Sequence, residues 1–279
     1  MEYQDALSQH VPWASLIHAN VARFSVVLVV GMAMGCVARR PPSPDSPRPA
    51  TKPTAAIHLP GRTIIGQSVQ GRPIELVRFG DAPAPVLVIA AIHGDEPTSK
   101  YVADRLIETL AGIPHVNAAI IPCANPDGLA ADRRTNDHGV DLNRNFPAAN
   151  WKKGHPGRTD GGPAPASEPE SAALLEVLTA LKPRLIISIH SMETPCDNYD
   201  GPGKCVAELM SRHNHYPVRA TIGYPTPGSL GSWAGIDRSI PIITLELPRH
   251  QPGEVAWEAN REALVAVLGQ FPAPVSASP

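Results

Sequence analysis

Pro85-Val-Leu-Val-Ile-Ala-Ala-Ile92 is a continuous apolar run that leads directly into His93-Gly-Asp-Glu96. A run of this length predicts a central strand that is buried on both faces of a parallel sheet. Apolar side chains at helical spacing follow in residues 96–110, which predicts a helix. The sequence therefore predicts a βα unit whose strand ends at a histidine and whose helix opens with a glutamate.

Segments with strand and helix patterns alternate along the rest of the chain. Residues 63–69 and 73–79 predict a hairpin around the turn Gln70-Gly71-Arg72. Glu170 stands three residues after Ser167, a spacing that predicts a capping box and a helix continuing to Leu181. Further elements are expected as strands at residues 116–123, 185–189, 220–224 and 242–247, and as a closing helix at residues 254–268.

This order of elements predicts the fold class. Strands that alternate with helices indicate an α/β fold, with a mostly parallel, mixed β-sheet flanked by helices on both faces. The chain has 279 residues, and we expect a single catalytic domain over residues 56–275. Ligands of such sheets collect beyond the carboxyl ends of the strands, where His93 and His190 both stand.

Residues 1–35 predict an export signal or a membrane anchor. The apolar run from Phe24 to Gly35 has twelve residues, which is short for a spanning helix and typical of a signal peptide. Ala33-Met-Gly-Cys36 resembles a bacterial lipobox, so Cys36 is a candidate site of lipidation and membrane attachment. An uncleaved anchor and cleavage elsewhere are the alternatives. Because two acidic residues stand among the first five, we expect translation to start later, at Val21.

Residues 36–55 predict a linker, because proline at this density favours extended chain and builds no core. The whole chain contains 32 prolines, about twice the ordinary usage. The formal net charge of -2 gives no indication of a nucleic-acid surface. The sequence therefore predicts a folded domain carried on an extended stalk, with no nucleic-acid partner.

Three residues have the types and positions of an open zinc site. His93 and His190 each end a predicted strand, and Glu96 opens a predicted helix. Two imidazoles and one carboxylate would leave the fourth zinc position free for water. The alternatives are a surface loop at the first histidine and a hydrogen-bonded core histidine at the second. Position at the strand ends favours the metal site.

Glu246 lies between Leu245 and Leu247 in the last predicted strand. Burying a carboxylate there is costly unless the group has a partner or a chemical purpose. One interpretation is a general base that takes a proton from water and delivers it to a leaving amine. The other is a buried salt bridge to an arginine.

These motifs together resemble the zinc carboxypeptidase family related to carboxypeptidase A. The resemblance implies one Zn²⁺ ion per chain, bound by His93, Glu96 and His190, and it places the catalytic glutamate at Glu246. It spreads over roughly the last four-fifths of the chain, which makes chance assembly improbable. The segments that carry it are residues 93–96, 124–130, 139–151, 167–170 and 224–233.

The resemblance also implies roles for residues that contact substrate. Asn143 and Arg144 fall where the family grips a terminal carboxylate, for which a guanidinium is well shaped. Arg134 falls where an arginine polarises the scissile carbonyl, with a surface turn and the neighbouring Arg133 as alternatives. Tyr224 would hydrogen-bond the substrate, or be a simple strand-end aromatic residue. Gly231 takes the position that selects side chains, where glycine leaves space and no charge.

Asp95 stands between the first two ligands, in the form His93-Gly-Asp-Glu96. This form is similar to that of family members that act on cell-wall peptides rather than on dietary protein. This implies hydrolysis of the γ-D-glutamyl–meso-diaminopimelate bond of peptidoglycan peptides, in an exported enzyme of the cell envelope. Deacylases of N-acyl amino acids, related to succinylglutamate desuccinylase and aspartoacylase, share the Asp-Leu-Asn-Arg element and are the alternative. A non-catalytic lipoprotein that binds peptidoglycan is a third interpretation.

Cys196 and Cys205 flank a loop soon after His190, and an exported protein could join them in a disulfide. The spacing alone leaves a bonded and a free pair equally open, because sequence does not give the distance between the Cα atoms.

Overall fold

The computed structural model describes residues 61–154 and 159–270 of the chain. The predicted signal or anchor segment 1–35, Cys36 and the linker 36–55 lie outside the described residues. Within the described part, no helix has the length and apolar character needed to cross a membrane.

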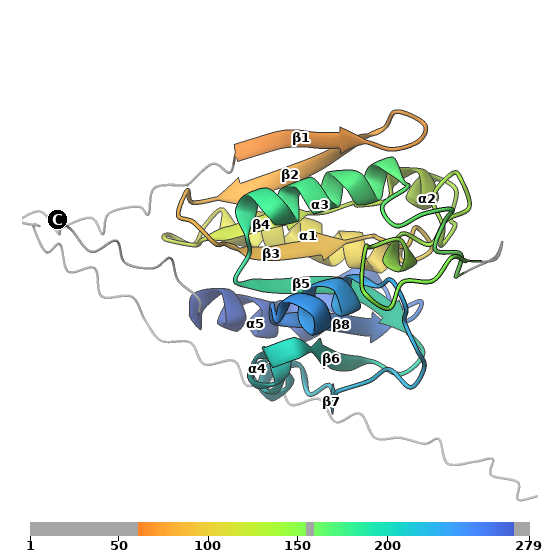
Figure 1. Ribbon diagram of the computed structural model, residues 1–279. Helices are drawn as coiled ribbons and strands as arrows, with labels where there is room; N and C mark the ends of the chain where they lie inside the picture. Colours follow the sequence, from red (N-terminus) through yellow and green to blue (C-terminus); the bar gives the residue numbers. More distant parts are fainter. Residues whose placement is uncertain (1–60, 155–158, 271–279) are drawn as a thin grey trace, which may run out of the picture. The chain divides into compact units, whose positions relative to one another are not determined.

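One eight-stranded sheet forms the centre of the fold, in the order β1-β2-β4-β3-β5-β8-β6-β7 (Figure 1). Four neighbouring strands in its middle, β4, β3, β5 and β8, are parallel. The hairpin β1–β2 and the pairs β2–β4 and β6–β8 are antiparallel. The bounds are β1 Gly61–Gln67, β2 Pro73–Phe79, β3 Val86–Ala90, β4 Ala118–Ile121, β5 Leu185–Met192, β6 Cys196–Asp200, β7 Val218–Arg219 and β8 Ile242–Pro248.

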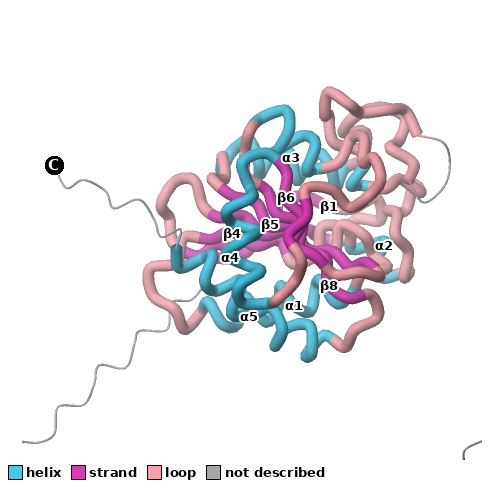
Figure 2. The backbone as a smooth tube through the Cα atoms, turned by 90° about the horizontal axis from the view of Figure 1, so that it is seen from below, coloured by secondary structure: helices cyan, strands magenta, loops and turns pink. Residues whose placement is uncertain are grey.

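Helices cover both faces of this sheet, as Figure 2 shows with the sheet seen from below. Helices α1, α4 and α5 lie on one face, and α3 lies on the other. The predicted fold class, an α/β fold with a mostly parallel mixed sheet, is confirmed. The bounds are α1 Pro97–Leu110, α2 Pro126–Ala130, α3 Pro169–Leu181, α4 Lys204–Asn214 and α5 Gly253–Gln270, with short helical turns at Leu142–Arg144, Gly201–Gly203 and Ser232–Ile236.

The alternation of side chains along β5 explains where the functional groups lie. Ile187 and Ile189 pack in the core beneath α1, α4 and α5. Ile186 packs in the second core, beneath α3. Because successive side chains point to opposite faces, Ser188 and His190 share the α3 face with Ile186. This face is apolar at the amino end of the strand and polar at its carboxyl end.

Two local predictions are wrong. The strand expected at residues 220–224 is absent, and only Val218–Arg219 pairs with β6. Gly223 has a φ of 93°, outside the extended region, and Pro225 has no N–H to pair. Glu168, not Ser167, precedes the first residue of α3, so the predicted capping box does not form.

The two carboxylates at the start of α3 have other partners. Glu170 accepts hydrogen bonds from the backbone N–H of Val69 and from Nδ2 of Asn136. Ser167 donates its hydroxyl hydrogen to the carboxylate of Glu168. Glu170 therefore ties α3 to the β1–β2 turn instead of closing the end of its own helix.

Cys196 and Cys205 are both free. Cys196 is buried in β6 and pairs across the sheet with Glu246, so it lies on the α3 face. Cys205 is exposed in α4, which covers the opposite face. Of the two alternatives that the sequence left open, the structure has the free pair, because the sheet separates the two thiols.

A buried polar network joins β6 to α4 and α5. Nδ2 of Asn214 lies 3.1 Å from Oδ1 of Asp197 and 3.1 Å from Oδ1 of Asn260. The amide of Asn260 in turn donates to the hydroxyl of Tyr216. Burial raises the pKa of Asp197 to about 7 from its ordinary value of 3.8. Asp197 is therefore a buried acid that loses its proton near neutral pH.

Replacing Asp197 with asparagine is expected to stabilise the protein at pH 8, by about 1–3 kcal/mol. Between pH 4 and 7 the folded chain holds this proton more tightly than the unfolded chain, so wild-type stability falls as pH rises through that window. The gain of Asp197→Asn should fall to about a quarter at pH 4.5. Urea unfolding at both pH values measures it, and a variant less stable than wild type at pH 8 would contradict the assignment.

Candidate active site

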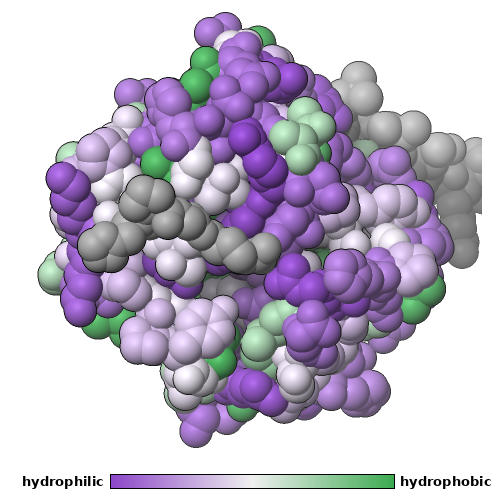
Figure 3. Space-filling model, turned by 90° about the vertical axis from the view of Figure 1, so that its right-hand side faces the viewer, coloured by the Kyte–Doolittle hydropathy of each residue, from purple (hydrophilic) through white to green (hydrophobic). Residues whose placement is uncertain are grey.

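The candidate site lies where β3, β5 and β8 end, on the α3 side of the sheet. His93 follows β3, and Glu96 precedes the first residue of α1. His190 lies in β5, and Glu246 lies directly opposite it on the neighbouring parallel strand β8. Figure 3 shows the molecule from the side on which the parallel strands end, and most of that face is hydrophilic. The three strand ends thus bring residues far apart in sequence into one polar pocket.

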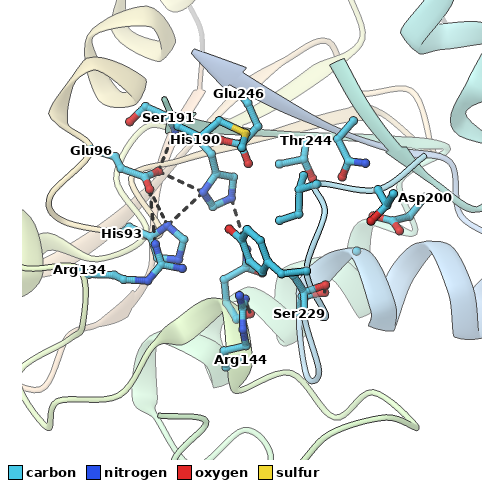
Figure 4. A pocket seen from close by; sticks show the side chains of 18 of the residues that line it. His93, Glu96, Arg134, Arg144, His190, Ser191, Asp200, Ser229, Thr244 and Glu246 are labelled. Carbon is cyan, nitrogen blue, oxygen red and sulfur yellow. Dashed lines mark hydrogen bonds and ion pairs between the residues drawn. The ribbon is translucent and has the colours of Figure 1, made fainter. Parts of the chain in front are cut away.

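His93, Glu96 and His190 meet with their binding atoms close together (Figure 4). Nδ1 of His93 lies 2.9 Å from Oε1 of Glu96, and Nδ1 of His190 lies 3.1 Å from Oε2. The two Nδ1 atoms are 3.1 Å apart, and all the candidate ligand atoms lie within 4.8 Å of one another. Each residue is no more than 3% exposed. The predicted ligand set is therefore assembled.

The chemistry of these three groups fits a zinc ion. Two imidazole nitrogens and a carboxylate are the usual protein ligands of catalytic zinc, with one position left for water or substrate. The pocket also favours positive charge: burial lowers the pKa of His93, but the carboxylates of Glu96 and Asp141 raise it to about 9 overall. Across residues 61–154 and 159–270, no other cluster of three such side chains meets the same distances.

Asp141 contacts the ring nitrogen of His93 that is not the candidate metal ligand, and this role was not predicted. Its Oδ1 lies 3.1 Å from Nε2 of His93, and its Oδ2 accepts a hydrogen bond from Nε of Arg134. A carboxylate on the far nitrogen fixes the orientation and tautomer of a metal-binding histidine. The Asp141-Leu-Asn-Arg144 motif contains this aspartate, but functions were predicted only for its last two residues. Asp141 thus positions one ligand and one arginine together.

Replacing Asp141 with asparagine is expected to weaken zinc binding about 10- to 100-fold, because His93 loses the acceptor that orients its ring. Competition against a fluorescent chelator measures the change. Asp137→Asn is the matched control, since Asp137 lies in the same segment but forms an ion pair with Arg133 instead. Equal zinc affinities for all three proteins would contradict this role.

Glu246 is 7% exposed, and burial raises its pKa. Among the described residues it forms no ion pair, and Arg134 acts on its charge only at longer range, so the alternative of a buried salt bridge is not what the structure has. Its strand pairing with His190 places the carboxylate beside the metal ligands (Figure 4). The arrangement suits a base that keeps a high affinity for a proton.

Arg134, rather than Arg133, faces the pocket. The Arg134 side chain is 13% exposed, and its Nη1 lies 3.7 Å from Oε1 of Glu96. Arg133 is more exposed and pairs with Asp137. Because Asp141 holds the Arg134 guanidinium from one side, the other side stays directed into the pocket. The structure thereby decides an assignment that the sequence left open by one residue.

The other predicted substrate contacts also line this pocket. Arg144 is buried, and its Nη1 donates to the carbonyl of Asn143 at 2.6 Å. Asn143 accepts a hydrogen bond from the backbone N–H of Leu230, which ties the Leu142–Arg144 turn to the loop before Gly231. Tyr224 is half exposed on the same loop. The structure brings all nine predicted site residues to one place.

A sequence model of the zinc carboxypeptidase family matches residues 60–200. The chain belongs to the zinc carboxypeptidase family. This result confirms the predicted family, its hydrolase class and its zinc cofactor, for which the His93–Glu96–His190 triad is a suitable site.

Relatives of this zinc carboxypeptidase include murein peptide amidase A of Escherichia coli, which is 35% identical over 208 residues, covering 68% of this chain and 82% of the relative. Murein peptide amidase A of Vibrio campbellii is 30% identical over 243 residues, covering 80% and 93%. The crystal structure of the murein-tripeptide amidase from E. coli O157 superposes with a TM-score of 0.66 at 30% identity, covering 78% of this chain and 94% of the other. Carboxypeptidase A from Helicoverpa armigera has a TM-score of 0.67 at 20% identity, covering 79% and 70%, which shows the shared fold alone.

Proposed function

We propose that this protein hydrolyses the γ-D-glutamyl–meso-diaminopimelate bond of peptidoglycan-derived peptides. The observation that carries the proposal is the joining of two sites in one pocket: the His93–Glu96–His190 triad beside Glu246, and Arg144 beside Asn143. The first arrangement suits amide hydrolysis, and the second suits a free carboxylate next to the bond that is cut. The similarity to the murein peptide amidases supports this class of peptide.

The triad, Glu246 and Arg134 have separate tasks in this reaction. When bound by the triad, zinc supplies the Lewis-acid chemistry that activates water and polarises the scissile carbonyl. Glu246 accepts the proton of the attacking water on its carboxylate and delivers it to the leaving amine. Arg134 donates hydrogen bonds to the oxygen on which negative charge develops.

The remaining residues hold the substrate. Arg144 binds the α-carboxylate of the residue to be released, and Asn143 orients it. Tyr224, half exposed on its loop, donates its phenol hydrogen to the substrate. Because the carboxylate is fixed next to the scissile amide, the reaction releases a terminal residue.

Mass spectrometry of L-alanyl-γ-D-glutamyl-meso-diaminopimelate tests the proposal. The zinc-loaded full-length protein should release diaminopimelate, while its Glu246→Gln variant should leave the tripeptide intact. N-succinylglutamate serves as the comparison substrate for the deacylase alternative. Turnover of N-succinylglutamate without release of diaminopimelate would replace the proposed reaction with deacylation, and binding of the tripeptide without turnover of either would indicate the non-catalytic alternative.

We also propose that the enzyme works at the cell envelope, on the basis of the apolar run Phe24–Gly35 and the lipobox-like Cys36. Fractionation of the source cells, with mass spectrometry of the N-terminal peptide, tests this location. A lipidated peptide beginning at Cys36 would support a membrane anchor. Recovery in the cytosol alone would overturn the proposal.

A further inference from the structure

Arg249 lines the pocket, and neither the metal site nor the proposed reaction uses it. It follows β8 directly, and its backbone N–H donates to the carbonyl of Met192 at the end of β5, 3.0 Å away. Its Nη2 donates to the carbonyl of Ser191, also at 3.0 Å. These two contacts hold the guanidinium against the carboxyl end of β5, immediately after the candidate metal ligand His190.

Ser191 connects Arg249 to the metal site. Its backbone N–H donates to Oε2 of Glu96 at 3.1 Å, while its carbonyl accepts from Arg249. Because the nitrogen and the carbonyl oxygen of one residue are at most about 3.6 Å apart, Nη2 of Arg249 lies within about 10 Å of a candidate zinc-ligand atom. Figure 4 shows Ser191 and Arg144 on opposite sides of His190. Guanidinium groups therefore lie on both sides of the candidate ligands.

The guanidinium of Arg249 is able to take an anion from the pocket. The side chain is 21% exposed, and within residues 61–154 and 159–270 its one carboxylate partner is Glu193, 3.4 Å from Nε. Glu193 is 82% exposed, and such an ion pair contributes little stability because water competes for both charges. The contacts with Ser191 and Glu193 involve Nη2 and Nε, whereas a guanidinium has five N–H donors. An anionic ligand can therefore displace Glu193 at small cost.

The proposed substrate carries an anion that the residues assigned so far do not bind. In a γ-glutamyl linkage the scissile carbonyl is the side-chain carbonyl, so the α-carboxylate of the glutamyl residue stays free. Four bonds of about 1.5 Å join the two carbonyl carbons, a span of about 5 Å when extended. Because Arg144 holds the residue that is released, the glutamyl residue lies on the other side of the scissile bond, where Arg249 stands.

We propose that Arg249 binds this free α-carboxylate on the acyl side of the scissile bond. The inference rests on the proposed function, because the direction of the substrate follows from Arg144 holding the released residue. A guanidinium matches a carboxylate with two parallel hydrogen bonds, so the pair selects by geometry as well as by charge. The enzyme therefore selects peptides with an acidic γ-linked residue and rejects those in which this carboxylate is amidated.

Two tripeptides that differ in one group test the proposal: L-alanyl-γ-D-glutamyl-meso-diaminopimelate and its isoglutaminyl analogue, in which the α-carboxylate is an amide of nearly the same shape. We expect the zinc-loaded full-length protein to favour the carboxylate peptide by about 10- to 100-fold in kcat/KM. Arg249→Gln should lose this factor on the carboxylate peptide, mainly through KM, and change the rate on the amide peptide little. Equal losses on both peptides, or a wild type without preference, would overturn the proposal.

Two further arginine variants control this comparison. Arg249→Lys keeps the charge without the two parallel donors, and it should retain part of the preference. Arg133→Gln is the matched control, since Arg133 pairs with Asp137 and does not line the pocket, and it should not change the ranking of the two peptides. Zinc content and a melting curve show whether each variant keeps the metal site and the fold. If Arg249→Gln does not fold, the wild-type preference and its reduction in Arg249→Lys decide the proposal.

An α-linked glutamyl peptide separates the two possible sources of the carboxylate. In L-alanyl-α-L-glutamyl-meso-diaminopimelate the side-chain carboxylate is the same number of bonds from the scissile carbonyl, but the peptide chain leaves from a different atom. We expect Arg249→Gln to lower kcat/KM for the γ-linked peptide more than for the α-linked one. A greater loss on the α-linked peptide would assign Arg249 to a side-chain carboxylate and overturn the proposal.

Glu193→Gln tests the same site in the opposite direction. Removing the carboxylate that pairs with Arg249 should lower KM for the carboxylate peptide by up to about fivefold, because the substrate no longer has to displace it. KM for the amide peptide should stay unchanged. An increase in KM for the carboxylate peptide would contradict displacement of Glu193 by the substrate.

Binding of the acyl-side products keeps the test independent of turnover. Calorimetry should show tighter binding of L-alanyl-D-glutamate than of L-alanyl-D-isoglutamine to the zinc-loaded wild type, and equal binding of the two to Arg249→Gln. If no tripeptide is cleaved but this difference is seen, the proposed reaction fails and the role of Arg249 stands. If diaminopimelate is released from both tripeptides at equal rates, the reaction stands and this inference fails.

Discussion

Replacing Glu246 with glutamine is expected to lower kcat for the tripeptide by about 10³-fold or more, while the fold and the zinc content stay unchanged. The amide has nearly the same shape as the carboxylate but accepts no proton from the attacking water. Burial raises the pKa of Glu246, so its charged form is less well stabilised in the folded protein than in water. Removing the charge should therefore leave thermal stability unchanged or slightly increased.

The measurement is steady-state kinetics beside zinc analysis and a thermal unfolding curve. Glu176→Gln, an exposed position in α3, is the matched control and should retain wild-type kinetics. A Glu246→Gln variant that keeps one zinc ion and more than about a tenth of the wild-type rate would exclude this residue as the base.

Replacing His190 with alanine is expected to abolish both zinc retention and activity. The substitution removes one of the three candidate zinc ligands. The loss in zinc affinity should therefore exceed the loss of about 10- to 100-fold that we expect when Asp141, which only contacts a ligand, is replaced. The substitution also removes the imidazole ring whose Nδ1 lies 3.1 Å from Oε2 of Glu96 and 3.1 Å from Nδ1 of His93. The increase in melting temperature that zinc gives the wild type should disappear as well, since a ligand stabilises only the state that binds it.

Zinc content after dialysis, together with melting curves with and without added zinc, measures this effect. His213→Ala is the matched control, because His213 lies near the end of α4 with a partly exposed side chain. Retention of one tightly bound zinc ion by His190→Ala would show that the ligand set has been misassigned.

The metal site could be predicted because its ligands stand at the ends of strongly patterned segments. The apolar runs before His93 and before His190 predict buried parallel strands, and the carboxyl ends of such strands meet at one edge of the sheet. Glu246 was predicted for a related reason, since a lone carboxylate among apolar residues is costly without a purpose. In each case the decisive information is local in the sequence.

Other groups depend on contacts that no local pattern encodes. Arg133 and Arg134 are equivalent as sequence, and only the carboxylate of Asp141 decides which of them faces the pocket. Strand β6 is short and polar, and it was not predicted because its pairing with β8 defines it more than its own residues do.

The sequence by itself was enough to predict the fold class, the candidate zinc ligands and the candidate base, because hydrophobic periodicity and ligand chemistry act over short stretches of chain. The tertiary structure alone decided which charged groups lie beside Gly231. Gly231 predicts an uncharged space when it is considered by itself, yet β6 places the Asp200 carboxylate in that space. The charge of a pocket is the sum over every strand that reaches it, and that sum exists only once the chain has folded.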